Sequence, residues 1–116
     1  MHVYADSDAI YLAQAAVSGT ELGELIGRCI EELEPYDVPD LGSLIKVLVV
    51  EPDDDMTAVD GALGFPLLDR QCDVAQRHQD WFELTLVLSD DGFGVVLYVP
   101  RNADPTLLSY CHRATR

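Results

Sequence analysis

Two apolar runs separated by turn residues form the clearest pattern in the chain. The runs span residues 82–88 and 93–99, and Ser89 to Gly92 lie between them. This arrangement predicts a β-hairpin. In the first run every second residue, beginning at Phe82, is large and apolar, so one face of the strand is apolar and the other is mixed.

The length of the turn decides which residues of the hairpin face one another. A two-residue loop, 91–92, gives the pairs Leu88–Val95, Leu86–Leu97 and Leu84–Val99. A four-residue loop, 89–92, buries the same face. A three-residue loop shifts the pairing by one residue and turns Leu84 and Leu86 toward partners on the wrong face, so we disfavour it.

Helical periodicity occurs twice before the first strongly apolar strand. Residues 6–17 begin with candidate caps at Asp6, Ser7 and Asp8 and continue with good helix formers, which predicts a first helix. Residues 2–4 are compatible with a short strand before it. A second helix over residues 18–34 begins with the capping-box spacing of Ser18 and Glu21. Its two glycines, at positions 23 and 27, indicate close contact with another element.

The remaining segments include a predicted strand and a predicted helix, separated by segments without a regular pattern. Residues 44–50 are apolar on both faces and predict a central strand, whereas 56–70 allows one helical turn near 57–63 with Asp55 as its cap. Residues 71–80 are polar and indicate a loop or a short helix. Asp104 and Pro105 predict the start of a final helix.

This order of elements predicts an α+β domain built from two layers. We expect a sheet of three or four mainly antiparallel strands with the helices on one face. A chain of 116 residues, 48% hydrophobic, suits one globular domain spanning residues 1–116.

Composition also bears on location. The longest apolar run, 47–50, is far below the roughly 20 residues that span a bilayer, so we expect no membrane partner. The N-terminal residues lack the basic start and apolar block of a secretion signal, which predicts a cytoplasmic location. Three widely spaced cysteines fit a reducing compartment.

The formal net charge of −14 is unevenly distributed along the sequence. Residues 1–69 carry 15 acidic and 2 basic side chains, and residues 70–116 carry 6 acidic and 5 basic side chains. Such a field repels nucleic acid and anionic membrane and attracts a basic protein surface. Solubility alone is the simpler interpretation.

Two groups of residues are candidates for contact with a partner. The acidic group consists of Glu31, Glu32, Glu34, Glu51, Asp53, Asp54, Asp55 and Asp60. The apolar group consists of Phe65, Leu67 and Leu68, which mix with turn formers in an irregular segment and form a contact patch if they are exposed.

Catalytic and metal chemistry receive little support from the sequence. The run 53–55 offers oxygen ligands suited to Ca²⁺ or Mg²⁺, but it lacks the alternating ligands and closing glutamate of an EF-hand loop. Cys72 with His78, and Cys111 with His112, lack the short paired spacing of structural zinc sites. We therefore expect no cofactor, no metal and no catalytic residue.

One stretch resembles a known group of proteins. Residues 80–100, DWFELTLVLSDDGFGVVLYVP, followed by the DPTLL start of the last helix, resemble part of a small uncharacterised protein family of proteobacterial mobile elements. The resemblance covers about a third of the chain. It implies an accessory gene of a phage, plasmid or integrated element, and it supplies no activity or catalytic residue.

The favoured functional hypothesis is a non-enzymatic acidic binding protein that docks onto a basic surface. Its sharpest form is a nucleic-acid mimic, or an inhibitor of a nucleic-acid-binding complex of the antirestriction or anti-CRISPR type. One alternative is a small metal- or ligand-binding domain or enzyme that uses Asp53–Asp55 with His78 or Cys72. The other is a homo-oligomeric accessory protein that uses residues 64–68 or an open sheet edge.

Overall fold

A computed structural model describes residues 1–33, 45–88 and 94–115 of the chain. Several sequence-based expectations fall outside these residues: the carboxylate of Glu34, the connection 35–42 and the turn of the central hairpin.

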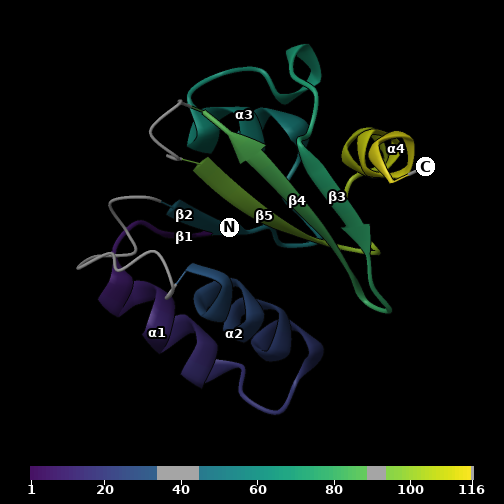
Figure 1. The fold of residues 1–116 in the computed structure, drawn as a ribbon. Coiled ribbons are helices and arrows are strands. Elements are labelled where there is room, and N and C mark those ends of the chain that lie inside the picture. Colours follow the sequence, from purple (N-terminus) through teal and green to yellow (C-terminus); the bar gives the residue numbers. More distant parts are fainter. Residues whose placement is uncertain (34–44, 89–93, 116) are drawn as a thin grey trace.

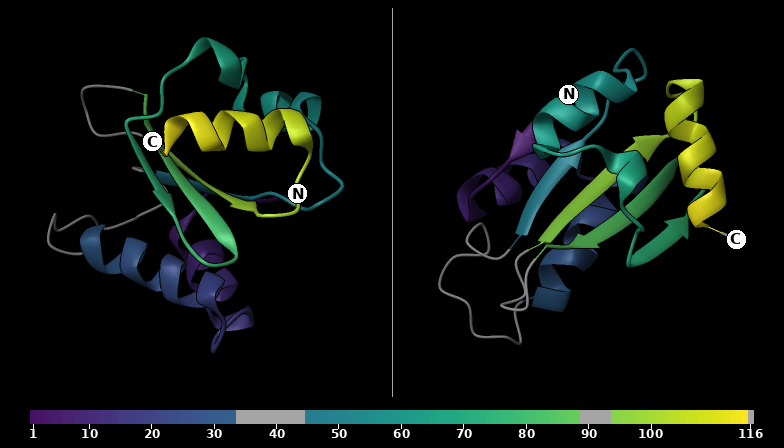
Figure 2. Two further views of the ribbon diagram at one scale, coloured as in Figure 1. Left: turned by 90° about the vertical axis from the view of Figure 1, so that its right-hand side faces the viewer. Right: turned by 90° about the horizontal axis from the view of Figure 1, so that it is seen from above.

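A single sheet separates two layers of helices (Figure 1). Helices α1 (Ser7–Ala16) and α2 (Glu21–Leu33) cover one face. Helix α3 (Met56–Leu63), the 3-10 helix η3 (Leu67–Asp69) and helix α4 (Pro105–Ala114) lie against the other face (Figure 2). The predicted α+β class is confirmed. The two-layer arrangement with helices on one face is wrong, because the sheet is apolar on both sides and needs cover on both.

The sheet has five strands, in the order β1 (His2–Tyr4), β2 (Ile45–Val49), β5 (Gly94–Pro100), β4 (Trp81–Val87) and β3 (Val74–Arg77). Strands β2 and β5 pair in parallel, and the other three pairings are antiparallel. The expectation of three or four mainly antiparallel strands is therefore only roughly matched. Within the apolar segment 44–50, Ile45–Val49 form an inner strand, since β2 has a neighbour on either side.

The central hairpin buries the predicted face with a different register. Strands β4 and β5 pair Phe82 with Val99, Leu84 with Leu97 and Leu86 with Val95. These are the pairs that a four-residue connection gives, so the pairs written for a two-residue loop are wrong by two positions. The buried face is unchanged because a shift of two preserves the alternation of a strand.

Helices α1 and α2 pack against each other as well as against the sheet. Asp6 caps α1 by accepting a hydrogen bond from the backbone N–H of Ala9, at 2.8 Å. Helix α2 begins later than predicted, because Thr20 rather than Ser18 accepts from a first-turn amide, that of Gly23, at 3.2 Å. A Cβ atom at Gly23 would collide with the backbone carbonyl of Val17. A Cβ atom at Gly27 would lie 2.9 Å from the side-chain nitrogen of Gln14 in α1, so the expectation of close contact with another element is confirmed there.

The opposite layer forms the larger core cluster around Phe82, Leu84 and Leu97, which are fully buried. Asp55 caps α3, as predicted, and Asp104 caps α4 next to Pro105. Gly64 ends α3 with a positive φ of 84°, the left-handed conformation that glycine adopts without strain.

Candidate functional site: the carboxylates of α2 and the trough beside them

The acidic run after β2 is built into the fold. The Asp54 carboxylate accepts a hydrogen bond from the backbone N–H of Glu51 and forms an ion pair with the Met1 ammonium, both at 2.9 Å. These two contacts hold the pKa of Asp54 below its usual value, the backbone hydrogen bond having the larger effect. Asp55 accepts from the Ala58 N–H at 2.9 Å. The run therefore serves as a turn and a helix cap.

Two further members of the predicted acidic group are also engaged. Glu51 contacts His2 Nε2 at 2.8 Å, and Asp60 accepts a hydrogen bond from the backbone N–H of Leu67 at 2.9 Å. Asp53 is exposed, and it makes no hydrogen bond or ion pair with any described residue. The loop Asp53–Asp55 consequently has two of its three carboxylates committed to the fold.

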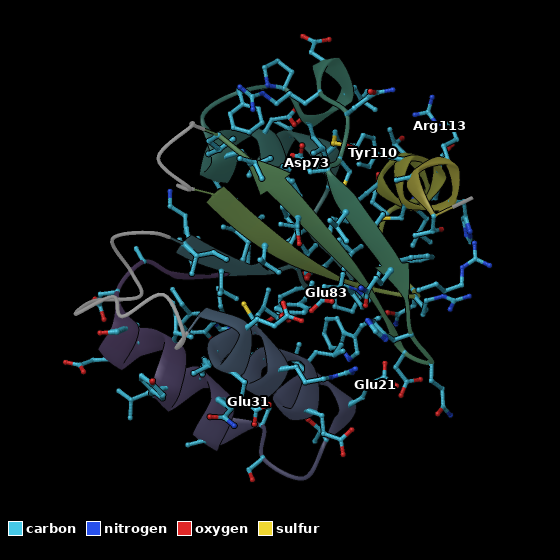
Figure 3. All side chains as sticks on the ribbon, in the orientation of Figure 1. Glu21, Glu31, Asp73, Glu83, Tyr110 and Arg113 are labelled. Carbon is cyan, nitrogen blue, oxygen red and sulfur yellow. The ribbon has the colours of Figure 1, made fainter. Side chains whose placement is uncertain are left out.

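The carboxylates of α2 differ from those of the run. Glu24, Glu31 and Glu32 are exposed, and they make no hydrogen bond or ion pair within the described part of the chain. Figure 3 shows Glu31 on the helical layer, away from the sheet. Glu21 is the exception, because its Oε1 accepts from the Asp80 N–H at 2.9 Å.

The structure does not gather the predicted acidic residues on one surface. Glu21 contacts the end of the sheet where β5 finishes, since Asp80 also binds the Arg101 amide. Glu31 lies about 15 Å further along the helix at 1.5 Å per residue, toward the opposite end. Because β2 runs parallel to β5, the run 51–55 follows the same end of the sheet that Glu21 contacts, so Glu31 and Glu32 lie apart from it.

The arginines of the described residues do not neutralise the carboxylates. No arginine or lysine there lies within 4.0 Å of an acidic side chain. Three of the guanidinium groups lie over aromatic rings instead. Arg70 lies 4.8 Å from the centroid of Phe65, and Arg77 and Arg101 lie 5.6 and 4.8 Å from that of Phe82. Glu24, Glu31 and Glu32 on α2 thus form no ion pair with a described cation.

The predicted apolar contact patch does not form as a unit. Leu67 is fully buried in the core, which removes it as a contact residue. Phe65 is half-buried under Arg70, and Leu68 alone is well exposed, at 51%. The patch required all three residues to be exposed, and only Leu68 is.

The cysteines and histidines do not come together as reactive pairs. The Cys72 thiol donates to the carbonyls of Val74 and Thr85 and packs against the α3–α4 core, while His78 contacts Glu83 on the α2 side. Burial raises the pKa of Cys111 to about 12. Among the described residues no three metal-binding side chains cluster.

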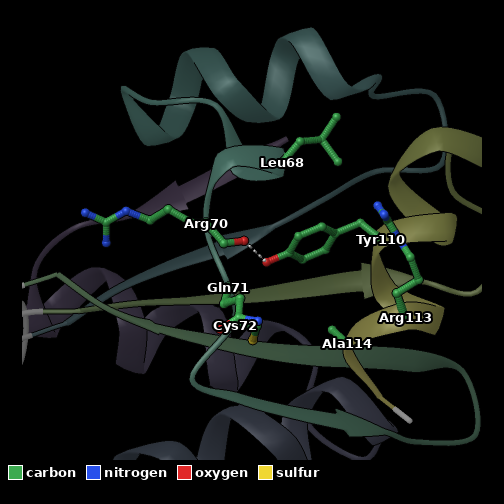
Figure 4. Close-up of a pocket in the computed structure, with 7 residues that line it drawn as sticks. All are labelled: Leu68, Arg70, Gln71, Cys72, Tyr110, Arg113 and Ala114. Atoms are coloured by element: carbon green, nitrogen blue, oxygen red, sulfur yellow. Dashed lines mark hydrogen bonds between the residues drawn. The ribbon is translucent and has the colours of Figure 1, made fainter.

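A pocket of about 430 Å³ is lined by η3, the connection 70–72 and α4 (Figure 4). The Tyr110 hydroxyl donates to the Arg70 carbonyl at 3.0 Å, and burial raises the pKa of this hydroxyl to about 12. Figure 4 shows the Arg70 guanidinium pointing away from Tyr110. The hydrogen bond between Tyr110 and Arg70 therefore links the connection before β3 to α4.

A second hollow lies beside α2 and was not predicted from the sequence. This trough, about 230 Å³, has α2 on one side and β3 and β4 on the other, and Glu32 and Glu83 both line it. Figure 3 shows Glu83 in the space between the sheet and α2. Its side chain is 19% exposed, and His78 Nε2 lies 3.6 Å from its carboxylate. The alternation of β4 identified Glu83 as facing away from the hairpin core, but not what it faces.

Two ionisable side chains beside Glu83, those of Cys29 and Tyr98, are held neutral. Burial raises the pKa of the Cys29 thiol to about 11, with Glu83 and Glu32 adding to the effect. Burial also raises the pKa of the Tyr98 hydroxyl, which donates to the Leu25 carbonyl at 3.3 Å. A protonated thiol is a poor nucleophile, so this cluster is better suited to binding than to covalent chemistry.

Comparisons with protein-family models, with curated proteins and with solved structures find no match. The resemblance of residues 80–100 to a mobile-element family therefore stays a prediction. No helix within the described residues is both long and apolar enough to cross a bilayer.

Proposed function

We propose that the protein binds a basic protein surface through the exposed carboxylates of α2. The observation that carries this proposal is the contrast in how the described residues use their charges: Glu24, Glu31 and Glu32 form no ion pair, although Arg28 lies on the same helix, while three of the arginines pack on aromatic rings. Residues 1–33 carry six acidic side chains and one basic side chain, Arg28. A partner that presents lysines or arginines supplies the missing counter-charge.

The position of these carboxylates on the helix supports a role outside folding. Glu31 and Glu32 lie in the last turn of α2, which has no basic residue. The carbonyl end of a helix carries partial negative charge, so carboxylates there oppose the helix dipole. Because Glu31 and Glu32 do not stabilise their own helix, their position is better explained by binding to a partner.

Binding of this kind depends on ionic strength. Exposed charges are screened over about 8–10 Å at physiological salt. Complementary charge mainly raises the association rate. We expect labelled polylysine to bind at low salt and to dissociate as salt is added, as followed by fluorescence anisotropy.

A matched pair of double variants locates the surface. Glu24→Gln with Glu31→Gln removes two charges from α2, and Asp53→Asn with Asp69→Asn removes two exposed charges elsewhere. We expect the α2 variant to weaken polylysine binding about fivefold at low salt, since exposed pairs are worth about 0.2–1 kcal/mol each. The control should change binding less than twofold. Equal losses, or binding indifferent to salt, would contradict the proposal.

The sharper form of the proposal is that the partner is a nucleic-acid-binding complex whose basic clusters normally hold phosphates. The sign and density of the charge support it. Competition decides it: with a basic nucleic-acid-binding protein as the probe, this protein should displace duplex DNA from it. The α2 double variant should displace DNA less well than the control. Binding that leaves the DNA in place would exclude a mimic.

A further inference from the structure

Strand β3 leaves one edge of the sheet open. It is the last strand of the sheet, and three of its four residues are exposed. The His78 N–H donates to the Trp81 carbonyl, so those two residues form a hydrogen-bonded pair. Hydrogen-bonded and non-bonded pairs alternate along an antiparallel ladder. The N–H and C=O groups of Ala75 and Arg77 therefore point outward, away from β4.

The α2 layer stops short of this edge. Val74 and Val87 are both 50% exposed, although they lie on the sheet face that α2 covers further in. The trough begins here, with Val74 and Gln76 on its β3 side and Thr85 at its floor. An apolar strand face beside unpaired backbone groups is the arrangement that accepts an additional strand.

The charges around the trough indicate what kind of strand fits. Glu32 and Glu83 line it with a single cation, Arg28. Glu83 is the half-buried member, and no lysine or arginine among the described residues lies within 4.0 Å of it. A strand added beside β3 would run two strand spacings, about 10 Å, from β4. A lysine and a glutamate side chain together span that gap.

We propose that β3 accepts an extended basic segment of the partner as a sixth strand, with a lysine or arginine side chain of that segment entering the trough beside Glu83 and Glu32. This inference rests on the proposed function and names where the basic partner docks. A second copy of this chain is the less suitable occupant, since two molecules of net charge −14 repel each other.

The probe is a labelled peptide of about eight residues in which lysine and threonine alternate, a length typical of a strand. The same peptide N-methylated at alternate residues keeps its charge but cannot pair on that edge. We expect the N-methylated peptide to bind at least tenfold more weakly. We also expect the parent peptide to slow hydrogen exchange at the Ala75 and Arg77 amides, and not at Gln76, whose amide already faces β4.

Two single variants with the same charge change separate the trough from charge in general. Gln76→Lys places an ammonium group on the wall of the trough, whereas Gln71→Lys adds one at an exposed position beside α4. We expect the first to weaken peptide binding about tenfold and the second less than twofold. Circular dichroism and thermal unfolding confirm that both variants are folded.

The outcomes distinguish this inference from the proposed function. Equal binding of the two peptides, or unchanged exchange at Ala75 and Arg77, would overturn strand addition. The wider proposal would still stand if Glu24→Gln with Glu31→Gln weakened polylysine binding. Protection of the same amides that rises with protein concentration in the absence of peptide, together with a dimer in light scattering, would overturn the basic segment in favour of a second copy.

Discussion

The two acidic groups of this protein look alike in sequence and differ in what their carboxylates do. In the run 51–55 and at Asp60, every carboxylate except that of Asp53 accepts a hydrogen bond from a backbone amide or contacts another group of the same chain. On α2, Glu31 and Glu32 are exposed and lie at the helix end where negative charge is unfavourable. The density of carboxylates in a sequence thus says little about which of them are available to a partner. What separates Asp54, Asp55 and Asp60 from Glu31 and Glu32 is whether a backbone N–H lies within reach.

The largest difference between the groups should come from Asp60. Asp60→Ala leaves the part-buried Leu67 N–H without its acceptor and loosens η3, whose Leu67 side chain is fully buried. An unsatisfied buried donor costs about 1–3 kcal/mol, and we expect the free energy of unfolding in urea to fall by that amount. Asp60→Asn keeps an acceptor oxygen and should lose less than half as much. Equal losses would show that the carboxylate charge, not the hydrogen bond, is what matters.

A smaller loss is expected at the cap of α3. Asp55→Ala removes the acceptor of the Ala58 N–H, and loss of such a cap costs about 1 kcal/mol. Asparagine caps helices about as well as aspartate, so Asp55→Asn should be close to the parent protein in thermal unfolding. If alanine at this position were as stable as asparagine, the run would not be holding the helix.

The pH dependence of stability distinguishes Asp54 from its neighbour Asp53. Because the pKa of Asp54 is lowered in the folded protein, its contribution to stability is present above the usual value of 3.8 and is lost as pH falls through the folded pKa. We expect Asp54→Asn to flatten the decline in the free energy of unfolding between about pH 5 and pH 2. Asp53→Asn, which removes an exposed carboxylate without contacts, should leave the slope as it is.

The smallest effect, and one of opposite sign, is expected on α2. Glu31→Gln with Glu32→Gln removes negative charge from the carbonyl end of the helix, which should raise the free energy of unfolding by about 0.3–1 kcal/mol at low salt. The gain should shrink as salt is added. A loss of stability in this double variant would mean that these carboxylates belong with the run 51–55 after all.

Local signals allowed much of the fold to be predicted from the sequence. The caps at Asp6, Asp55 and Asp104 were readable because a capping side chain and the amide it binds are only two or three residues apart. The buried face of the hairpin was readable because alternation survives an error of two positions in register. The loop length that sets the register was not readable, since both Asp91–Gly92 and the longer Ser89–Gly92 segment are good turn formers.

The features that were missed depend on distant parts of the chain. Strand β3 has the sequence VAQR, which carries no strand pattern of its own and becomes a strand through its pairing with β4. The division of helices between two faces depends on the path of the chain, which periodicity does not record. The trough joins Glu32 to Glu83 across 51 positions of sequence. Nothing local to either glutamate indicates that they share a hollow.

The central strand of the sheet, β5, is the last strand to be synthesised. Strand β5 lies between β2 and β4, and its parallel partner β2 precedes it by 49 positions at the matched pair Ile45 and Gly94. Pairings between distant segments form slowly, because a long loop must close before any contact is gained. During synthesis, β1, α1, α2 and β2 leave the ribosome without the strand that completes both cores. Until residue 100 has emerged, the nascent chain exposes apolar surface, and its high negative charge keeps such intermediates from associating with one another.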